Sequence, residues 1–312
     1  MYNYVKKTFG AFEKYIISND SGDSMTIVPA FGANLLDLQF GDISVIDGYQ
    51  TPEALVENAW GKSIVLFPFP NRLRDGRYTH DGNAYQFPIN NEDTNNAIHG
   101  FGYKTEMTVS EVKTTENEGI LTCCYTHDGA HEAYPFRFTF QITFILRGSS
   151  LDVEMTFTNN DSKVIPVGLG WHPYYRLSEK SDDTFLQMPD CQLVAIDERM
   201  LPTGSKSDFT DFQTLTQIKD GFLDNGFYLK NQTQNAAIIL SSNVGKLTCW
   251  QETGAGKWNF VQVFTPPHRK SIAIEPMTCN VDAFNNKDGL VLLQPESVLT
   301  GRFGVRFQKK TA

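Results

Sequence analysis

The stretch Phe136–Leu146, FRFTFQITFIL, decides the fold class of this chain. Its apolar side chains fall on every second position, at Phe136, Phe138, Phe140, Ile142, Phe144 and Leu146. A period of two is typical of a β-strand with one buried face. The next apolar run, LDVEMTF at Leu151–Phe157, alternates in the same way, and the turn-like RGSS at 147–150 separates the two runs. We therefore expect a β-hairpin here.

Similar short runs, bounded by turn residues, continue along the chain. We expect strands at Met25–Pro29, Ile43–Ile46, Gly119–Thr126, Ala236–Leu240, Lys257–Phe264, Ser271–Ile274, Leu290–Leu293 and Arg302–Phe307, and a hairpin turning at Asp81-Gly82. One short helix is expected after Thr51, because Thr51 suits the N-cap and Pro52 the first helical position. Strands do not alternate with helices, and no linker appears. The pattern predicts an all-β fold, a large antiparallel β-sandwich, with residues 1–312 in a single domain.

The composition argues against several classes of function. The net charge is −9 and no run of Lys or Arg occurs, so binding of nucleic acid or of a membrane surface is not expected. The first residues lack the apolar run of a signal peptide, and no run approaches the ~18 apolar residues that span a membrane. Five cysteines without a Cys-x-x-Cys pair indicate free thiols in a reducing compartment. We expect a cytoplasmic protein that binds a neutral or polar small molecule.

Two titratable residues lie where strand patterns make a polar side chain costly. His172, in GLGWHPYYRL at 168–177, precedes Pro173, which favours an extended backbone, and imidazole can act as a general acid or base near neutral pH. Glu275 follows the apolar run SIAI, where a carboxylate must be paired or functional. From these residues alone, a packed core histidine and a salt bridge at a strand end remain alternatives.

Loops between the strand-like runs supply further candidates. His99 is followed by two glycines within AIHGFGY, which permit close approach of the backbone to a ligand. Asn71 and Arg72 follow an apolar run, and Asp224 lies in FLDNGFYL; their side chains suit hydroxyl or carboxylate groups. A loop histidine, a surface arginine and ordinary turn chemistry are the alternatives. No metal-ligand, nucleotide-binding or Gly-x-Ser-x-Gly spacing occurs, so we expect no metal and no cofactor.

Together these segments resemble the aldose 1-epimerase (galactose mutarotase) family. The similar motifs occur in the order of the family: PNRLRDGRY (70–78), IHGFGY (98–103), HPYYRL (172–177), LDNGF (223–227), IEPMTCNVDAFN (274–285) and LQPESV (293–298). The resemblance implies the galactose mutarotase-like supersandwich. Phe101 and Arg176 depart from the family pattern, which has Gly and Asn there. Arg74 and Arg176 add positive charge near the motifs.

The resemblance implies an enzyme that interconverts the α and β anomers of a free aldose such as glucose or galactose. Glu275 would be the base and His172 the acid, kept protonated by nearby acidic groups. His99 would hydrogen-bond the reacting end, and Asn71, Arg72 and Asp224 would hold sugar hydroxyls. The aromatic walls would come from Trp171, Tyr174 or Phe264. A monomer or homodimer without cofactor is expected.

Other functions remain open at this point. The added arginines leave a hexose-6-phosphate or modified-sugar epimerase as an alternative. A carbohydrate-binding protein without catalytic activity is a second alternative, and a glycan hydrolase or lyase is the least favoured.

Overall fold

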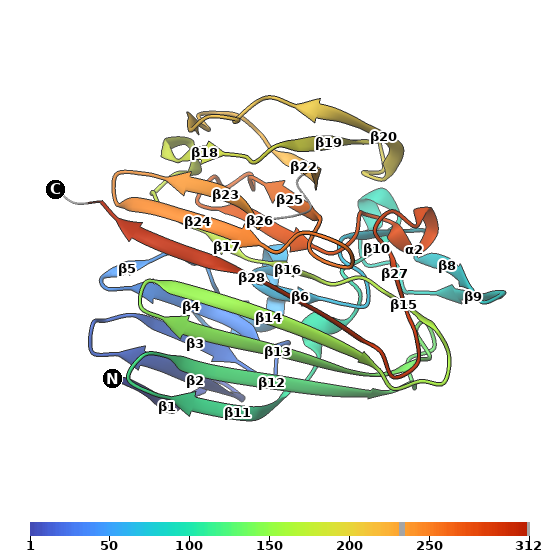
Figure 1. Cartoon of the computed structure of the whole chain (residues 1–312), viewed down its shortest axis with the longest axis horizontal. Helices are drawn as coiled ribbons and strands as arrows, with labels where there is room; N and C mark the ends of the chain where they lie inside the picture. The colour runs from blue at the N-terminus through green and yellow to red at the C-terminus, as the bar shows by residue number, and fades with distance from the viewer. Residues whose placement is uncertain (231–234, 311–312) are drawn as a thin grey trace.

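Most of the chain folds into three large antiparallel sheets, in a computed structural model that describes residues 1–230 and 235–310 (Figure 1). The five-stranded sheet has the order β1 (Tyr2–Phe9), β2 (Phe12–Asn19), β3 (Ser24–Val28), β4 (Asn34–Phe40), β5 (Ile43–Ser44). The nine-stranded sheet has the order β11 (Thr108–Thr114), β12 (Gly119–Asp128), β13 (Arg137–Arg147), β14 (Ser150–Asn159), β28 (Val298–Lys309), β24 (Gly245–Gln251), β23 (Ala236–Ser241), β18 (Phe185–Gln187), β21 (Thr216–Gln217).

The third sheet, with eight strands, carries the residues of greatest functional interest. Its order is β20 (Pro202–Phe209), β19 (Cys191–Ile196), β22 (Asp224–Leu229), β25 (Phe260–Phe264), β26 (Ile272–Met277), β16 (Gly170–His172), β6 (Ile64–Leu66), and β17 (Tyr174–Tyr175) also pairs with β26. Three two-stranded pairs complete the β-structure: β7 (Arg72–Arg74) with β10 (Asn96–Ile98), β8 (Arg77–His80) with β9 (Asn83–Gln86), and β15 (Ile165–Val167) with β27 (Val291–Leu293). The predicted antiparallel, nearly all-β fold is confirmed.

The period-two segments form the predicted hairpin. In β13 the alternate side chains of Phe138, Phe140, Ile142 and Phe144 are fully buried, and the residues between them are partly exposed. β14 pairs with β13 in the register Leu146 opposite Leu151, with the turn at 148–149. The turn at Asp81-Gly82 likewise joins β8 to β9.

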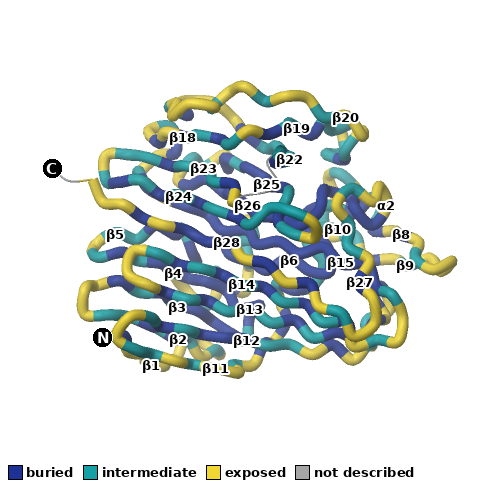
Figure 2. The backbone as a smooth tube through the Cα atoms, in the orientation of Figure 1, coloured by how far each residue is buried: buried dark blue, intermediate teal, exposed yellow. Residues whose placement is uncertain are grey.

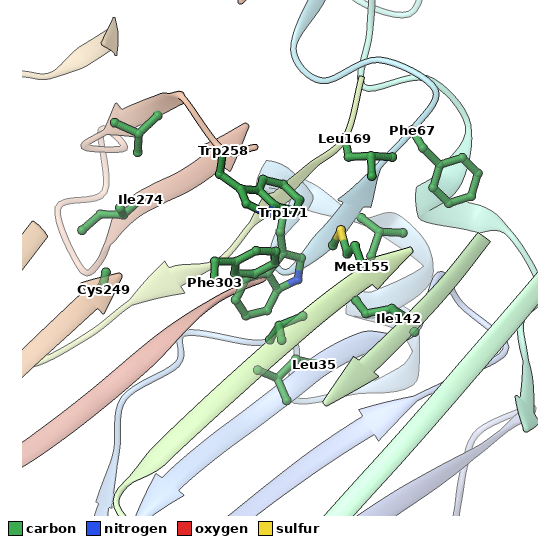
Figure 3. Packing of buried hydrophobic residues seen from close by; sticks show 14 of the residues in the cluster. Leu35, Phe67, Ile142, Met155, Leu169, Trp171, Cys249, Trp258, Ile274 and Phe303 are labelled. Atoms are coloured by element: carbon green, nitrogen blue, oxygen red, sulfur yellow. The ribbon is translucent and has the colours of Figure 1, made fainter. Parts of the chain in front are cut away.

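The nine-stranded sheet lies in front in Figure 1, with the five-stranded sheet and strands β6 and β16 of the eight-stranded sheet behind it. Strands β19 and β20 of the eight-stranded sheet lie above it in this view. A contiguous apolar cluster fills the space between the layers and includes residues from all three sheets, as Figure 3 shows in part. Exposed residues gather in the loops and along the outer strands β1 and β20 (Figure 2). The core therefore supports the eight-stranded sheet from one side.

The predicted helix is α1 (Pro52–Glu57), and Thr51 caps it by accepting a hydrogen bond from the Ala54 amide at 3.2 Å. A 3₁₀ turn at Ala59–Gly61 follows, in which Trp60 has a left-handed backbone (φ 67°). The other helical segments are short: α2 (Ala283–Asn286) and 3₁₀ turns at Glu92–Thr94, Gly102–Lys104 and Ser181–Asp183. Within the described residues, no helix is long and apolar enough to cross a membrane.

Candidate active site

A cavity of about 510 Å³ lies on the eight-stranded sheet and brings most of the predicted site residues together. Seven of the eight predicted residues line it: Asn71, Arg72, His99, His172, Tyr174, Asp224 and Glu275. They come from segments that span more than two hundred positions of the chain. Phe264, the other aromatic residue suggested by the sequence, also lines the cavity.

Strand register places the polar floor of this cavity. Gln262 on β25 lies opposite Glu275 on β26. On the other side of β26, Gly170 of β16 pairs with Met277, so the antiparallel register brings His172 opposite Glu275. Side chains at directly opposed positions point to the same face of a sheet. Three neighbouring strands therefore present Gln262, Glu275 and His172 in one row.

The central pair of the site is His172 and Glu275. His172 Nε2 lies 3.2 Å from Glu275 Oε1, and the two side chains are 8% and 2% exposed. The other polar atoms of the pair, His172 Nδ1 and Glu275 Oε2, are buried without a protein hydrogen-bond partner. A buried polar atom without a partner is costly, and such atoms are rare in folded proteins. Their presence at the bottom of a cavity indicates a role in binding or chemistry.

Burial dominates the protonation of this pair. Desolvation lowers the pKa of His172 to about 4. Desolvation, reinforced by nearby Asp224, raises the pKa of Glu275 well above its ordinary value, although Arg72 opposes this. Burial therefore favours the uncharged form of each group, a neutral imidazole on His172 and a protonated carboxyl group on Glu275. The prediction that nearby acidic groups keep His172 protonated is wrong for this pocket, because desolvation dominates the pKa of His172.

His99 and Asn71 are held by an unusual backbone arrangement beside the pair. Both residues have left-handed backbones (φ 68° and 55°), and the His99 amide donates to the Asn71 carbonyl at 2.8 Å. Gly100 follows because a Cβ there would lie 2.1 Å from the Phe67 carbonyl oxygen. Such strained residues are tolerated where the surrounding structure fixes them, frequently at functional sites. The His99 ring stands nearly perpendicular to the His172 ring, with centroids 5.3 Å apart.

Burial, followed by His172 and Arg72, lowers the pKa of His99 well below its ordinary value. The His99 imidazole is therefore neutral at pH 7. A neutral ring can donate through one nitrogen and accept through the other. Its Nδ1 atom is buried without a protein partner.

Arg72 supplies positive charge to the cavity. Its Nη1 donates to Asn71 Oδ1 at 3.1 Å, whereas its buried Nε has no protein partner. Asp224 accepts a hydrogen bond from Gln262 at 2.8 Å, and burial raises its pKa while Arg72 opposes the shift. The Asp282 amide donates to the Arg72 carbonyl, which ties the C-terminal motif to β7. The site thus contains both hydrogen-bond donors and acceptors.

Trp171 is the predicted site residue that the structure does not bring to the cavity. Its indole donates to the Ser63 carbonyl at 3.1 Å and packs on Phe303, with ring centroids 5.5 Å apart (Figure 3). The prediction is wrong because neighbouring residues of a strand face opposite sides, and His172 takes the cavity side of β16. Tyr174 is on that side: its ring stacks on His172 at 5.0 Å, and its hydroxyl donates to the Trp60 carbonyl.

Phe101 and Arg176, which depart from the family pattern, and Arg74 are not among the residues that line the cavity. Arg176 is exposed and faces a second hollow of about 1170 Å³. Arg74 lies 3.7 Å from carboxylate oxygens of both Asp197 and Asp282. Phe101 stacks on His131, with ring centroids 4.7 Å apart. The expected extra positive charge is therefore not delivered to the site by Arg74 or Arg176.

Several cavity residues were not predicted: Trp60, Asn90, Asn91, Tyr103, Lys104 and Gln262. Gln262 had a signal in the sequence, since it is a polar residue within the apolar run FVQVF. The others lie on turns and loops whose position depends on the folded chain. Over residues 1–230 and 235–310, no cluster of three or more His, Cys, Asp or Glu side chains is arranged to hold a metal ion.

Comparison with known proteins identifies the family. The family described as Aldose 1-epimerase matches residues 13–306, nearly the whole chain. The chain belongs to the aldose 1-epimerase family. The resemblance predicted from the motifs is thus confirmed, and catalysts of this family are isomerases that act on sugars.

Relatives within the family are distant. The chain is 29% identical to the uncharacterized protein YihR of Escherichia coli (strain K12), over 89% of this chain and 88% of that protein. It is 28% identical to galactose mutarotase of Rattus norvegicus, over 62% of this chain and 57% of that enzyme. Among solved structures, galactose 1-epimerase from Lactobacillus acidophilus NCFM has a TM-score of 0.84 at 18% identity, covering 100% of this chain and 99% of that one. A galactose mutarotase-like protein from Clostridium acetobutylicum has a TM-score of 0.87 at 19% identity, covering 99% of each chain. These structures share the fold.

Proposed function

We propose that the protein is an active aldose 1-epimerase that interconverts the α and β anomers of a free aldose such as glucose or galactose. The observation that carries the proposal is the buried pair: His172 Nε2 and Glu275 Oε1 lie 3.2 Å apart at the bottom of a cavity, and each side chain has a further buried polar atom without a protein partner. Anomer exchange needs two proton transfers at adjacent oxygens of one sugar, which suits two such groups.

In the proposed mechanism Glu275 acts as the base and His172 as the acid. Because burial favours a protonated Glu275 and a neutral His172, the reactive arrangement forms by transfer of a proton from Glu275 to His172. Arg72 favours the resulting carboxylate electrostatically. Glu275 then removes the proton of the C1 hydroxyl, the C1–O5 bond breaks, and O5 takes the proton of His172. After rotation about C1–C2, the same steps in reverse close the ring on the other face.

The remaining residues would bind and orient the sugar. Neutral His99 would hydrogen-bond the oxygen at C1, since its ring lies next to that of His172. Asn71, Arg72 and Asp224 would hold hydroxyl groups, with Gln262 fixing the Asp224 carboxylate. Tyr174 and Phe264 would provide apolar walls. No electrons are transferred, so the proposed reaction needs no cofactor.

The alternatives have less support. A phosphorylated substrate was suggested by Arg74 and Arg176, but Arg176 faces the second hollow and Arg74 lies beside two carboxylates. A protein that only binds sugar does not require a buried acid and base in contact. The proposal treats the chain as one domain acting in the cytoplasm, as a monomer or homodimer.

Polarimetry tests the proposal. Freshly dissolved α-D-glucose and α-D-galactose should reach anomeric equilibrium faster with the protein than without it. Glu275→Gln and His172→Ala should each remove most of that acceleration while circular dichroism shows a folded protein. Wild-type protein that binds sugar without accelerating equilibration would instead favour the binding-protein alternative, and full activity in both variants would refute the assigned roles.

A further inference from the structure

One wall of the cavity is a short loop that ends at His99, and we call residues 90–99 the wall loop. Four of its residues line the cavity: Asn90, Asn91, Ile98 and His99. Within the loop, the Asn91 and Asn96 amides each donate to the other's carbonyl at 3.1 Å, and a 3₁₀ turn at Glu92–Thr94 lies between them. The returning side of the loop is β10, which pairs with β7. The tip, residues 92–95, lies outside this pairing.

Arg199 binds the tip of the wall loop from a distant part of the chain. Its Nε donates to the Thr94 carbonyl at 3.0 Å, and its Nη2 donates to the Asn95 carbonyl at 2.8 Å. The same Nη2 lies 2.8 Å from Asp75 Oδ1 and 3.3 Å from Asn96 Oδ1. In return, the side-chain amide of Asn96 donates to the Arg199 carbonyl at 3.1 Å. One guanidinium therefore contacts three successive residues of the loop.

The other hydrogen bonds of the wall loop are local. Among the residues that the structure describes, its partners lie within residues 71–99, with the exception of Arg199. The turn between β19 and β20 that carries Arg199 is itself fixed, because Asp197 Oδ1 accepts from the Arg199 and Leu201 amides at 2.9 and 3.0 Å. Arg199 thus connects the loop to the eight-stranded sheet.

The wall loop needs support because part of its backbone is unfavourable. Asn95 at the tip and His99 at the end have left-handed backbones, with φ of 51° and 68°. Such conformations are uncommon outside glycine and persist where the surrounding structure fixes them. Arginine suits this task, since its planar guanidinium can donate to several oxygens at once. Arg199 does not line the cavity, so any effect on the reaction has to pass through the loop.

We propose that Arg199 is a positioning residue for the reaction: it fixes the tip of the wall loop, and the loop in turn holds His99 beside His172. Its bonds to two successive carbonyls, those of Thr94 and Asn95, set the place of the tip, and β10 leads directly from there to His99. A displaced loop would weaken sugar binding as well as catalysis, because the loop also forms a wall of the cavity. This inference rests on the proposed function.

The test measures kcat and KM for glucose mutarotation by polarimetry, with urea unfolding as a check on the fold. Arg199→Ala should raise KM by about 3- to 10-fold and lower kcat/KM by about 10- to 100-fold, because small displacements of binding groups are costly. Arg199→Lys keeps the charge but not the planar fork, so it should show the same changes more weakly. Arg147→Ala is the matched control and should keep both constants. Arg147 also binds two side chains, Glu118 at 2.8 Å and Asp152 at 3.1 Å, but it lies on β13 in the nine-stranded sheet.

The rise in KM separates positioning from stability. An unfolded fraction of protein lowers the apparent kcat and leaves KM unchanged, whereas a displaced wall raises KM. An unchanged KM in both Arg199 variants overturns the inference, whether or not kcat falls, and so does an equal rise of KM in Arg147→Ala. Should Arg199→Ala fail to fold, Arg199→Lys decides by the same criterion.

These outcomes leave the proposed function intact as long as the wild-type protein accelerates mutarotation. Wild-type protein that accelerates neither glucose nor galactose overturns the proposed function itself, and the positioning role of Arg199 with it.

Discussion

The cavity at His172 and the hollow at Arg176 differ in chemistry although the two residues are only four positions apart. The cavity contains four side chains with buried polar atoms that lack a protein partner: Arg72, His99, His172 and Glu275. In the hollow, none of the lining residues that the structure describes has such an atom, and Arg176 itself is exposed. The hollow is the larger of the two by volume. The candidate site is therefore distinguished by buried polar atoms that lack a protein hydrogen-bond partner, and not by its volume.

The largest expected difference between the two regions is the effect on kcat/KM of replacing a glutamate in each. Glu275→Gln should lower kcat/KM for glucose mutarotation by about 10²- to 10⁴-fold, because an amide cannot take the C1 hydroxyl proton. Glu179→Gln, in the second hollow, should leave the rate unchanged. The measurement is polarimetry, with urea unfolding as a check on the fold. Equal losses in the two variants would abolish the distinction between the regions.

Replacing an arginine in each region should change kcat/KM by factors that differ less. Arg72→Ala should lower kcat/KM by about 10- to 100-fold, because a charged hydrogen bond to the sugar is lost. Arg176→Ala should retain the wild-type value with unmodified glucose. If Arg176→Ala were instead the more damaging change, the substrate would have to reach the second hollow.

The activity should also depend on the single proton that the proposed mechanism requires the His172–Glu275 pair to hold. Below about pH 4 His172 becomes protonated, so that the pair holds a second proton, and kcat/KM should fall by about 10-fold per pH unit. It should fall again at high pH, above the raised pKa of Glu275, where the pair loses its last proton. The pH profile between pH 3 and 10 checks this.

Arg176→Ala serves as a control for the profile, since it should keep both limbs. An acid limb near pH 6.5, the ordinary value for histidine, would show that burial does not control His172.

Among the changes next to the cavity, the smallest effect on activity is expected on the core side of β16. Trp171→Phe removes the buried hydrogen bond to Ser63 and should lower the free energy of unfolding by about 1–3 kcal/mol. Its effect on kcat/KM should stay below about 2-fold, because the indole faces the core. Urea denaturation and polarimetry measure the two quantities. A loss of activity comparable to that of Arg72→Ala would show that the two faces of β16 are coupled.

Sequence alone predicted β13 and β14, and it missed β1 and β20. β13 and β14 bury every second side chain, so their period is visible in the sequence. β1 has buried residues only at its ends, and none of β20 is fully buried, so neither strand has an apolar face to detect. Edge strands of this kind are specified by pairing with a neighbour, which a local pattern does not contain.

The candidate site was also predicted in part, where a local pattern or the family resemblance marked a residue. Glu275 and His172 were recognised because charged or titratable groups stood in apolar runs, and the family resemblance linked them. The prediction for Trp171 is wrong because residues that are adjacent in a strand face opposite sides of the sheet. Trp60 gave no signal, since its left-handed backbone is fixed by Tyr49 and Tyr174 only in the folded chain.

The row formed by Gln262, Glu275 and His172 has a consequence for how members of this family can diversify. These three residues belong to paired strands, so none can shift by one position without turning to the opposite face. The residues at the mouth, such as Trp60, Asn91 and Lys104, lie on turns and loops that tolerate replacement. Loop exchange between family members should therefore transfer substrate preference while the reaction itself is inherited with the sheet.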